Sequence, residues 1–178
     1  RDYFDRKIRK KKGGGRDNLT PARFLDRYGN CFAQIAGSCR DGSYRFSAYN
    51  EKLILKGANK YPRVLSIPSI RDRLVLGVLN DYLSEAFKDC VSQVPNRLVE
   101  KVIQTLDNAD GKVYFLRTDF QNFYGSISIK ILMNMIRQRI DDENMLSLIY
   151  KAITTPTMSG HRQKNVNRKP KYGIPQGI

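Results

Sequence analysis

The chain has 178 residues, 40% of them hydrophobic, and its 32 lysine and arginine residues against 17 aspartate and glutamate residues give it a net charge of +15. This composition is typical of a folded protein, and the charge favours a polyanionic partner, with nucleic acid ahead of an acidic membrane surface. No run of about 18 apolar residues is present, so we expect no membrane-spanning helix, and the basic N-terminal stretch lacks the apolar core of a signal peptide, which predicts a cytoplasmic protein.

Cysteine and histidine are too few and too scattered for the common metal and hydrolase sites. The cysteines are Cys31, Cys39 and Cys90, and none of them belongs to a C-x-x-C pattern. Neither a zinc ribbon nor a disulfide framework is therefore expected. The single histidine, His161, lies in a polar, basic segment without a nearby nucleophile. This argues against a Ser-His-Asp hydrolase.

The N-terminal part of the chain predicts a flexible arm followed by a short helix. Residues 6–16 carry seven basic residues around three glycines. Such a run is typical of a cationic arm or loop that packs into no core. Residues 17–29 have the signals of a helix, with Asp17 or Thr20 placed to cap its start and Gly29 placed to end it.

Residues 42–68 predict short strands joined by turns. In residues 43–49 polar and aromatic side chains alternate, which is the pattern of a half-buried strand. Residues 52–68 predict a β-hairpin with lysines at its tip. Pro62 and Pro68 flank the second strand, which favours an edge position because proline cannot donate to a ladder.

Apolar residues recur at helical spacing in four segments, and we expect these stripes to pack in the core. The segments are residues 69–87, 97–106, 132–140 and 145–153. Ser128 is placed to cap the third of them. Residues 158–171 are polar and basic again, which predicts a loop.

Residues 113–120 predict a buried strand with Asp119 near its C-terminal end. A buried carboxylate is costly unless a cation meets it, and ligand sites of α/β sheets form at the carboxyl ends of strands. From the residues alone, Asp119 caps a helix, pairs with an arginine or holds a metal ion. The sequence leaves these alternatives open.

Four motifs, in order along the chain, resemble those of bacterial-type reverse transcriptases, the family of group II intron proteins, retron enzymes and defence-associated relatives. GRDNLTPARF (residues 15–24) is similar to the family's G-x-D-G-x-T-x-x-x-F motif, with Asn18 at the usual glycine. YPRVLSIPSIRDRLV (residues 61–75) resembles the fingers motif R-x-L-x-I-P-x-x-x-D-R. LRTDFQNFYGSI (residues 116–127) resembles the palm motif around the first catalytic aspartate, and GIPQG (residues 173–177) resembles the next palm motif.

The resemblance implies an α/β (α+β) fold of the right-hand polymerase type. Residues 1–107 would form the fingers and residues 108–178 the first part of the palm, while the C-terminal palm and the thumb are absent. We therefore expect the 178-residue chain alone to be inactive. Gly125 stands where the family commonly has aspartate, and the stretch after the long helix lacks the usual S-x-G-F-R-P-G run. Both departures favour a retron or antiviral-defence branch.

The resemblance also implies a metal site. Asp119 would be catalytic and would bridge two Mg²⁺ ions, which clamp the incoming triphosphate and activate the primer 3′-hydroxyl. The backbone carbonyl of Phe120 would be a further ligand, since magnesium prefers oxygen donors. Arg71, Asp72 and Arg73 are interpreted as structural, with Asp72 pairing with one of the two arginines.

Other residues of the same motifs would bind the incoming nucleotide. The assigned residues are Arg63, Lys60, Tyr124, Gln176 and Gly177, with Lys56 as the alternative to Lys60. The planar guanidinium of Arg63 suits phosphate oxygens. The ring of Tyr124 would block a ribose 2′-hydroxyl and favour dNTPs, although plain core packing is an alternative role for it.

The leading functional prediction is an RNA-directed DNA polymerase, whose partners are an RNA template, a nucleic-acid primer and dNTPs. The template would lie across the hairpin and the basic arm, held mainly by phosphate contacts. The alternatives are a non-catalytic RNA-binding protein on a polymerase scaffold and a template-independent nucleotidyl transferase. Nothing in the sequence indicates an oligomeric state.

Overall fold

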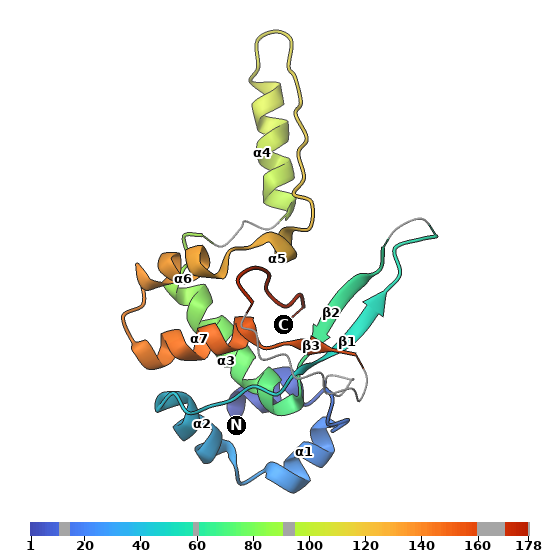
Figure 1. Cartoon of the computed structure of the whole chain (residues 1–178). Helices are drawn as coiled ribbons and strands as arrows, with labels where there is room; N and C mark the ends of the chain where they lie inside the picture. Colours follow the sequence, from blue (N-terminus) through green and yellow to red (C-terminus); the bar gives the residue numbers. More distant parts are fainter. Residues whose placement is uncertain (11–14, 59–60, 91–94, 160–169, 178) are drawn as a thin grey trace.

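Helix α3 (Ile70–Ala86) lies at the centre of a mixed α/β structure (Figure 1). The computed structural model describes residues 1–10, 15–58, 61–90, 95–159 and 170–177. Ser69 caps α3, because its hydroxyl accepts a hydrogen bond from the backbone N–H of Asp72 at 3.2 Å. The prediction of a long helix over residues 69–87 is confirmed.

The remaining helices are arranged around α3 or project from it. Their bounds are η1 Phe4–Ile8, α1 Pro21–Tyr28, α2 Phe32–Arg40, α4 Pro95–Asp107, α5 Phe123–Ser126, α6 Ile129–Arg137 and α7 Glu143–Thr154. Thr20, Ser128 and Asp142 cap α1, α6 and α7 with side-chain oxygens. The predicted helices at these positions are confirmed, and so is the one at α4. Within the described ranges, none of the helices combines the length and the hydropathy that crossing a bilayer requires.

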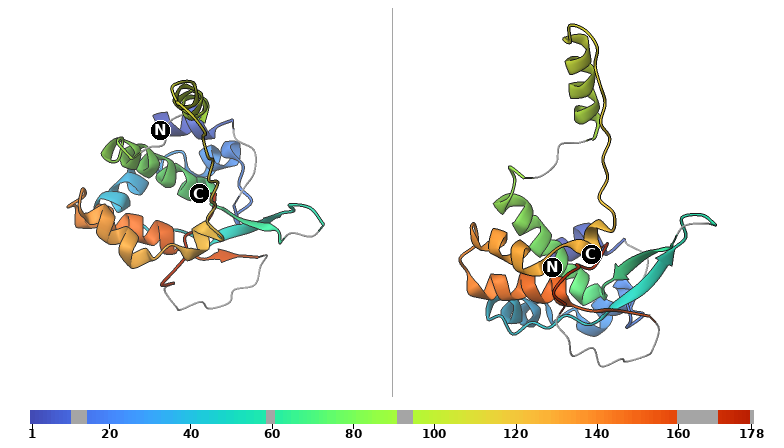
Figure 2. Two further views of the ribbon diagram at one scale, coloured as in Figure 1. Left: turned by 90° about the horizontal axis from the view of Figure 1, so that it is seen from above. Right: turned by 45° about the horizontal axis from the view of Figure 1, so that its top comes forward.

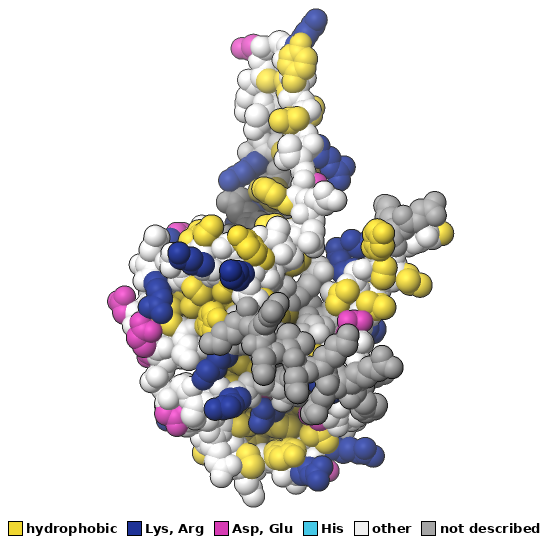
Figure 3. Space-filling view, in the orientation of Figure 1, with side chains coloured by type: hydrophobic (Ala, Val, Ile, Leu, Met, Phe, Trp, Pro, Cys, Tyr) yellow, Lys and Arg dark blue, Asp and Glu magenta, His cyan; other side chains and the backbone are white. Residues whose placement is uncertain are grey.

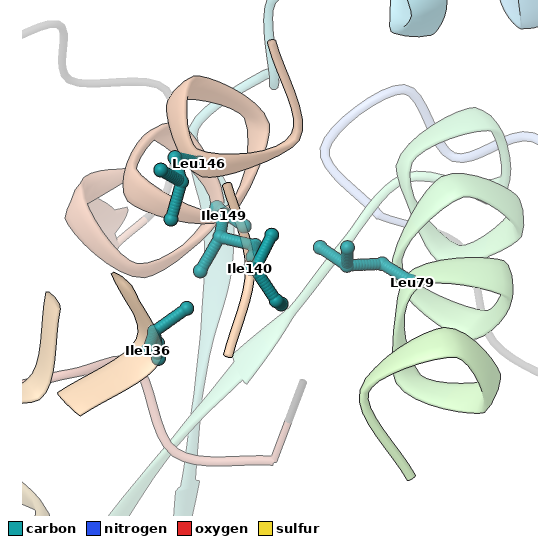
Figure 4. Close-up of a cluster of buried hydrophobic side chains, with 6 residues drawn as sticks. Leu79, Ile136, Ile140, Leu146 and Ile149 are labelled. Carbon is teal, nitrogen blue, oxygen red and sulfur yellow. The ribbon is translucent and has the colours of Figure 1, made fainter. Parts of the chain in front are cut away.

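Side chains of α3 enter three buried hydrophobic clusters. Leu79 packs against α6, α7 and the turn between them (Figure 4). Ile70 and Leu74 pack against η1 and α1, while Val75 contacts a third cluster that includes α7. Because burying each such side chain stabilises the fold by about 1.5–3 kcal/mol, α3 holds the other helices together.

The β-hairpin predicted over residues 52–68 is present. Strand β1 (Tyr49–Ile54) pairs antiparallel with β2 (Arg63–Ile67), with Ile54 opposite Arg63 and Asn50 opposite Ile67. A short strand, β3 (Thr157–Met158), adds to β1 in parallel, so the sheet order is β2-β1-β3. Strand β2 therefore lies at an edge of the sheet, as its flanking prolines predict.

Residues 43–48 form no strand, so the prediction of a strand over residues 43–49 is wrong except at Tyr49. These residues bind α3 through the fully buried carboxylate of Asp72 instead of a neighbouring strand. The Tyr44 hydroxyl donates to this carboxylate at 2.8 Å and the Ser47 backbone N–H donates to it at 3.1 Å. The carboxylate lies 3.7 Å from the Arg71 guanidinium, so the predicted pairing with arginine is a secondary contact.

The predicted cationic arm starts inside the folded body rather than outside it. Ile8 belongs to η1 and is 1% exposed, and Phe4 of the same helix is fully buried. Both side chains pack with Phe24 of α1. The basic residues of this helix are exposed, and its apolar residues face the core. This apolar stripe was not evident from the sequence, because most residues of the segment are charged. Residues 11–14 of the arm lie outside the described residues.

Helix α4 and the chain that follows it project from the body (Figures 1 and 2). Val102 on the apolar stripe of α4 is 48% exposed, and Leu116 of the following segment is 90% exposed. Hydrophobic side chains are visible along this projection in Figure 3. The prediction that the α4 stripe lies in the core and the prediction of a buried strand over residues 113–120 are both wrong for this structure. In the described part of the chain no strand pairs with residues 113–120, and a strand needs a neighbour to satisfy its backbone groups.

Replacing Gly15 with alanine is expected to destabilise the protein by about 1–3 kcal/mol, because the new methyl group has no room. A Cβ atom at Gly15 would lie 2.5 Å from the Cα atom of Ser69, the capping residue of α3. Gly37→Ala is the matched control, since its Cβ would meet no atom within 4 Å and helix α2 should gain about 0.5–1 kcal/mol. The midpoints of chemical denaturation measure both changes. A Gly15→Ala protein as stable as the unsubstituted one would contradict the close approach.

Candidate functional site

A pocket of about 540 Å³ lies where the β-hairpin, the chain after Asp119 and residues 174–176 meet. Its lining includes Lys56, Arg63, Asp119, Phe120, Tyr124 and Gln176. These residues come from three segments that are far apart in the sequence. The structure therefore brings into one pocket most of the residues that the motifs single out, although their roles stay predictions.

Two of the predicted nucleotide-binding residues are not seen in the pocket. Gly177 follows the lining residue Gln176, but it turns beside the Leu65 side chain with a φ of +90°. Lys60 lies outside the described residues. Lys56, the alternative to Lys60, does line the pocket.

Backbone hydrogen bonds of residues 173–176 join the other two walls of the pocket. The N–H of Ser66 on β2 donates to the carbonyl of Gln176 at 2.8 Å. On the opposite wall, the N–H of Ile174 donates to the carbonyl of Tyr124 at 2.9 Å. The position of Gln176 relative to both Arg63 and Tyr124 is thus set by main-chain contacts rather than by flexible side chains.

The floor of the pocket contains two hydroxyl groups that the sequence interpretation missed. The Ser66 and Thr157 side-chain oxygens lie 2.6 Å apart and link β2 to β3, and Ser66 is 2% exposed. A serine between the apolar residues Leu65 and Ile67 of β2 is the signal that could have pointed to it. Thr157 gave no signal, because its place beside Ser66 depends on the parallel pairing of β3.

Asn122 is a further pocket residue that the motifs did not indicate. It adopts the left-handed conformation, with φ 49° and ψ 45°, which asparagine tolerates better than most residues. A Cβ atom at Gly125 would lie 2.4 Å from the Asn122 amide nitrogen. The glycine that replaces the family's aspartate therefore leaves room for a neutral carboxamide. Among the described residues, the other asparagine with a positive φ is Asn18, at the first motif's usual glycine.

The Tyr124 ring does not belong to the buried core. It is 42% exposed, lines the pocket and packs edge-on against Phe123, with the ring centroids 5.4 Å apart. Core packing, the alternative role, is thus not what this ring does in the structure.

The charged lining residues are Lys56, Arg63 and Asp119, so the pocket carries two positive charges and one negative charge. This balance favours an anionic ligand. Asp119 is exposed, at the end of a segment that is not a strand. The expectation that burial forces a cation onto Asp119 therefore fails here. What remains is its place in a pocket that Lys56 and Arg63 also line. The Asp119 carboxylate forms no hydrogen bond or ion pair with the described residues.

The oxygen donors of the pocket suit magnesium, which takes few protein ligands and keeps several waters. Asp119 and Phe120 both line the pocket, and Asp119 brings the single carboxylate among the described lining residues. In the described part of the chain, no three His, Cys, Asp or Glu side chains form a group that could hold a metal ion. These residues could thus contribute one carboxylate and one carbonyl oxygen to a metal site.

Comparison with known proteins gives distant relatives over most of the chain, although no family model matches it. The chain is 25% identical to the group II intron-encoded protein LtrA of Lactococcus lactis subsp. cremoris, over 81% of this chain and 24% of that protein. It is also 25% identical to protein YkfC of Escherichia coli (strain K12), over 71% and 35%, and to a COX1/OXI3 intron 2 protein of Saccharomyces cerevisiae, over 96% and 20%.

The chain thus spans between 20% and 35% of the length of these relatives. Two of the three are intron-encoded proteins by name, which agrees with the motifs at both ends of the sequence. Together with those motifs, the matches support a distant relationship to the bacterial-type reverse transcriptases.

Proposed function

We propose that the chain is the fingers and the first part of the palm of a right-hand RNA-directed DNA polymerase, with the division near residue 107. The observation that carries this is the meeting of Arg63, Asp119, Tyr124 and Gln176 in one cationic pocket. A volume of about 540 Å³ lies in the range of small-molecule sites and accommodates a nucleotide. Gly125 and the missing S-x-G-F-R-P-G run support a retron or antiviral-defence type.

Each pocket residue has a task in this reaction. The cations of Arg63 and Lys56 would bind the triphosphate oxygens, Arg63 through its planar fork. Asp119 and the Phe120 carbonyl would hold Mg²⁺, which supplies charge neutralisation of the phosphates and activation of the primer 3′-hydroxyl. A two-metal site needs at least one more carboxylate, and we propose that the complete protein supplies it.

The RNA template would pass over the exposed side of the hairpin. Lys52 and Lys56 are exposed there, and Tyr61 next to the tip is 96% exposed. Lysines that contact phosphates and an aromatic ring that stacks on a base are the usual means of holding a single strand. This path leads toward the pocket, because Lys56 also lines it.

Primer extension by the product of the complete reading frame tests the proposal. DNA synthesis from dNTPs with Mg²⁺ that depends on an added RNA template would support the polymerase. Equal extension without template would establish a template-independent nucleotidyl transferase. Salt-sensitive RNA binding without any synthesis would instead mean a polymerase scaffold that only holds RNA.

Replacing Tyr124 with alanine is expected to reduce the preference for dNTPs over rNTPs by about tenfold to a hundredfold. The ring would no longer meet a 2′-hydroxyl, and a steric contact of this size contributes about 1–3 kcal/mol to discrimination. Tyr124→Phe is the control, because it keeps the ring and should keep the preference. The measurement is the ratio of kcat/KM for dNTP and rNTP incorporation; an unchanged ratio in Tyr124→Ala would refute this role.

A further inference from the structure

A second concave surface, of about 720 Å³, lies between α6, α7 and residues 170–172. We call it the α6–α7 groove. It shares no lining residue with the nucleotide pocket. The same short segment of chain nevertheless lines both, since Lys171 and Tyr172 face the groove and Ile174 to Gln176 face the pocket.

The α6–α7 groove carries uncompensated positive charge. Its charged lining residues are Lys130, Arg137, Glu143 and Lys171. Arg137 and Glu143 neutralise each other through two contacts, of 2.7 and 3.5 Å. The side chains of Lys130 and Lys171 are exposed, and neither ammonium group forms an ion pair or hydrogen bond with any described residue. Figure 3 shows Lys and Arg side chains gathered over α6.

An exposed aromatic ring stands beside these two lysines on a fixed backbone. Tyr172 is 65% exposed, and its main chain forms an antiparallel bridge with Ser128. The neighbouring Gly173 N–H donates to the Ile127 carbonyl at 2.8 Å, and the Lys171 carbonyl accepts from the Ile129 N–H at 3.2 Å. The ring is therefore displayed by a backbone that is bonded on both sides of it.

We propose that the α6–α7 groove binds single-stranded nucleic acid, with phosphates at Lys130 and Lys171 and one base stacked on Tyr172. Paired lysines and an exposed ring in a groove are the two elements with which proteins hold a single strand without reading its sequence. An acidic peptide would use the lysines but would gain little from the ring. The inference shares the nucleic-acid partner of the proposed polymerase, but it does not depend on catalysis.

Binding of a fluorescent 16-nucleotide single-stranded RNA, and of the DNA of the same sequence, to the complete protein tests the proposal. The double variant Lys130→Gln with Lys171→Gln is compared with Lys101→Gln with Lys112→Gln, which makes the same charge change at exposed residues on and beyond α4. A plot of the logarithm of the binding constant against the logarithm of the salt concentration has a slope of about 0.7 in magnitude for each phosphate contact with a single strand. We therefore expect the first pair of substitutions, which removes two contacts, to reduce the magnitude of this slope by about 1.4. The second pair should leave the slope unchanged.

The stacking contact is tested separately at constant salt. Tyr172→Ala should weaken binding about tenfold, and Tyr172→Phe should bind like the unsubstituted protein. Cross-linking from 4-thiouridine in the RNA should map to the peptide that contains Tyr172. If the substitutions weaken RNA binding and DNA binding alike, the groove is a general site for single strands. If they weaken the binding of only one of the two, that nucleic acid is the ligand of the groove.

Three results would overturn the proposal: equal effects of the two lysine pairs, unchanged binding by Tyr172→Ala, or competition by poly-glutamate as effective as that by RNA. The last would mean an acidic-peptide surface. If the predicted binding effects appear in a protein that synthesises no DNA, the polymerase proposal fails while the groove proposal stands. If DNA synthesis is template-dependent and these variants bind nucleic acid normally, the groove proposal fails while the polymerase proposal stands.

Discussion

Alanine in place of Asp119 is expected to lower the rate of template-directed DNA synthesis by at least about 10³-fold. The loss follows from the proposed role of this carboxylate as a metal ligand, since metal stabilisation of transition-state charge contributes several kcal/mol and about 4 kcal/mol corresponds to 10³ in rate. The side chain is exposed and has no hydrogen bond or ion pair with the described residues. Its removal should therefore leave stability and RNA binding unchanged.

Two control variants separate a metal ligand from a carboxylate that only adds charge. Asp141→Ala removes an exposed carboxylate before α7 and should retain full activity. Asp119→Glu keeps the charge on a longer arm and should recover part of the activity at raised Mg²⁺. Single-turnover primer extension gives the rates. Synthesis by Asp119→Ala within a few fold of the unsubstituted rate would remove Asp119 from the catalytic site.

Local signals in the sequence were reliable where the structure depends on neighbours along the chain. Thr20, one of the two predicted cap candidates for its helix, and Ser128 each lie one residue before a confirmed helix. The hairpin also followed from local pattern, because its two strands lie close together in the sequence. Helix α2 (Phe32–Arg40) was not predicted, since its glycine, serine and cysteine have weak helix propensity and its stability comes from packing.

Sequence patterns gave wrong predictions where the structure of a segment depends on contacts with residues far away in the sequence. The apolar run of residues 113–120 predicts burial, but periodicity does not say which element would cover it, and no described strand does. The residues of the pocket likewise fall into those that the sequence indicated and those that it did not. Arg63, Asp119 and Gln176 were found by motif, whereas the contributions of Asn122 and Thr157 arise from a left-handed turn and a parallel strand contact. Such contacts between segments have no local signature.

Replacing Asp72 with alanine is expected to destabilise the region around α3 by about 3–5 kcal/mol, the usual cost of removing one partner from a buried charged network. The carboxylate is fully buried and accepts hydrogen bonds from the Tyr44 hydroxyl, the Ser69 hydroxyl and the Ser47 N–H, at 2.8, 2.8 and 3.1 Å. Burial, followed by the charge of Asp72, raises the pKa of Tyr44 well above its ordinary value. The Tyr44 hydroxyl thus remains protonated and would be left as a buried donor without an acceptor.

Hydrogen exchange of the amides in α3 and in residues 43–50 measures this loss locally, even within a larger protein. Asp72→Ala should reduce protection there by about 150- to 5,000-fold, which corresponds to the stated energy. Asp142→Ala, the same substitution at the exposed cap of α7, should cost only about 1 kcal/mol, because a single capping bond to Met145 is lost. Tyr44→Phe should fall between the two, since it removes one donor and leaves the carboxylate with the others. Equal protection in the two aspartate variants would show that the buried network does not hold residues 43–47 on α3. The hairpin that carries Arg63 would then be held in place by other contacts, such as those with β3, with Gln176 and between Tyr49 and Ala152.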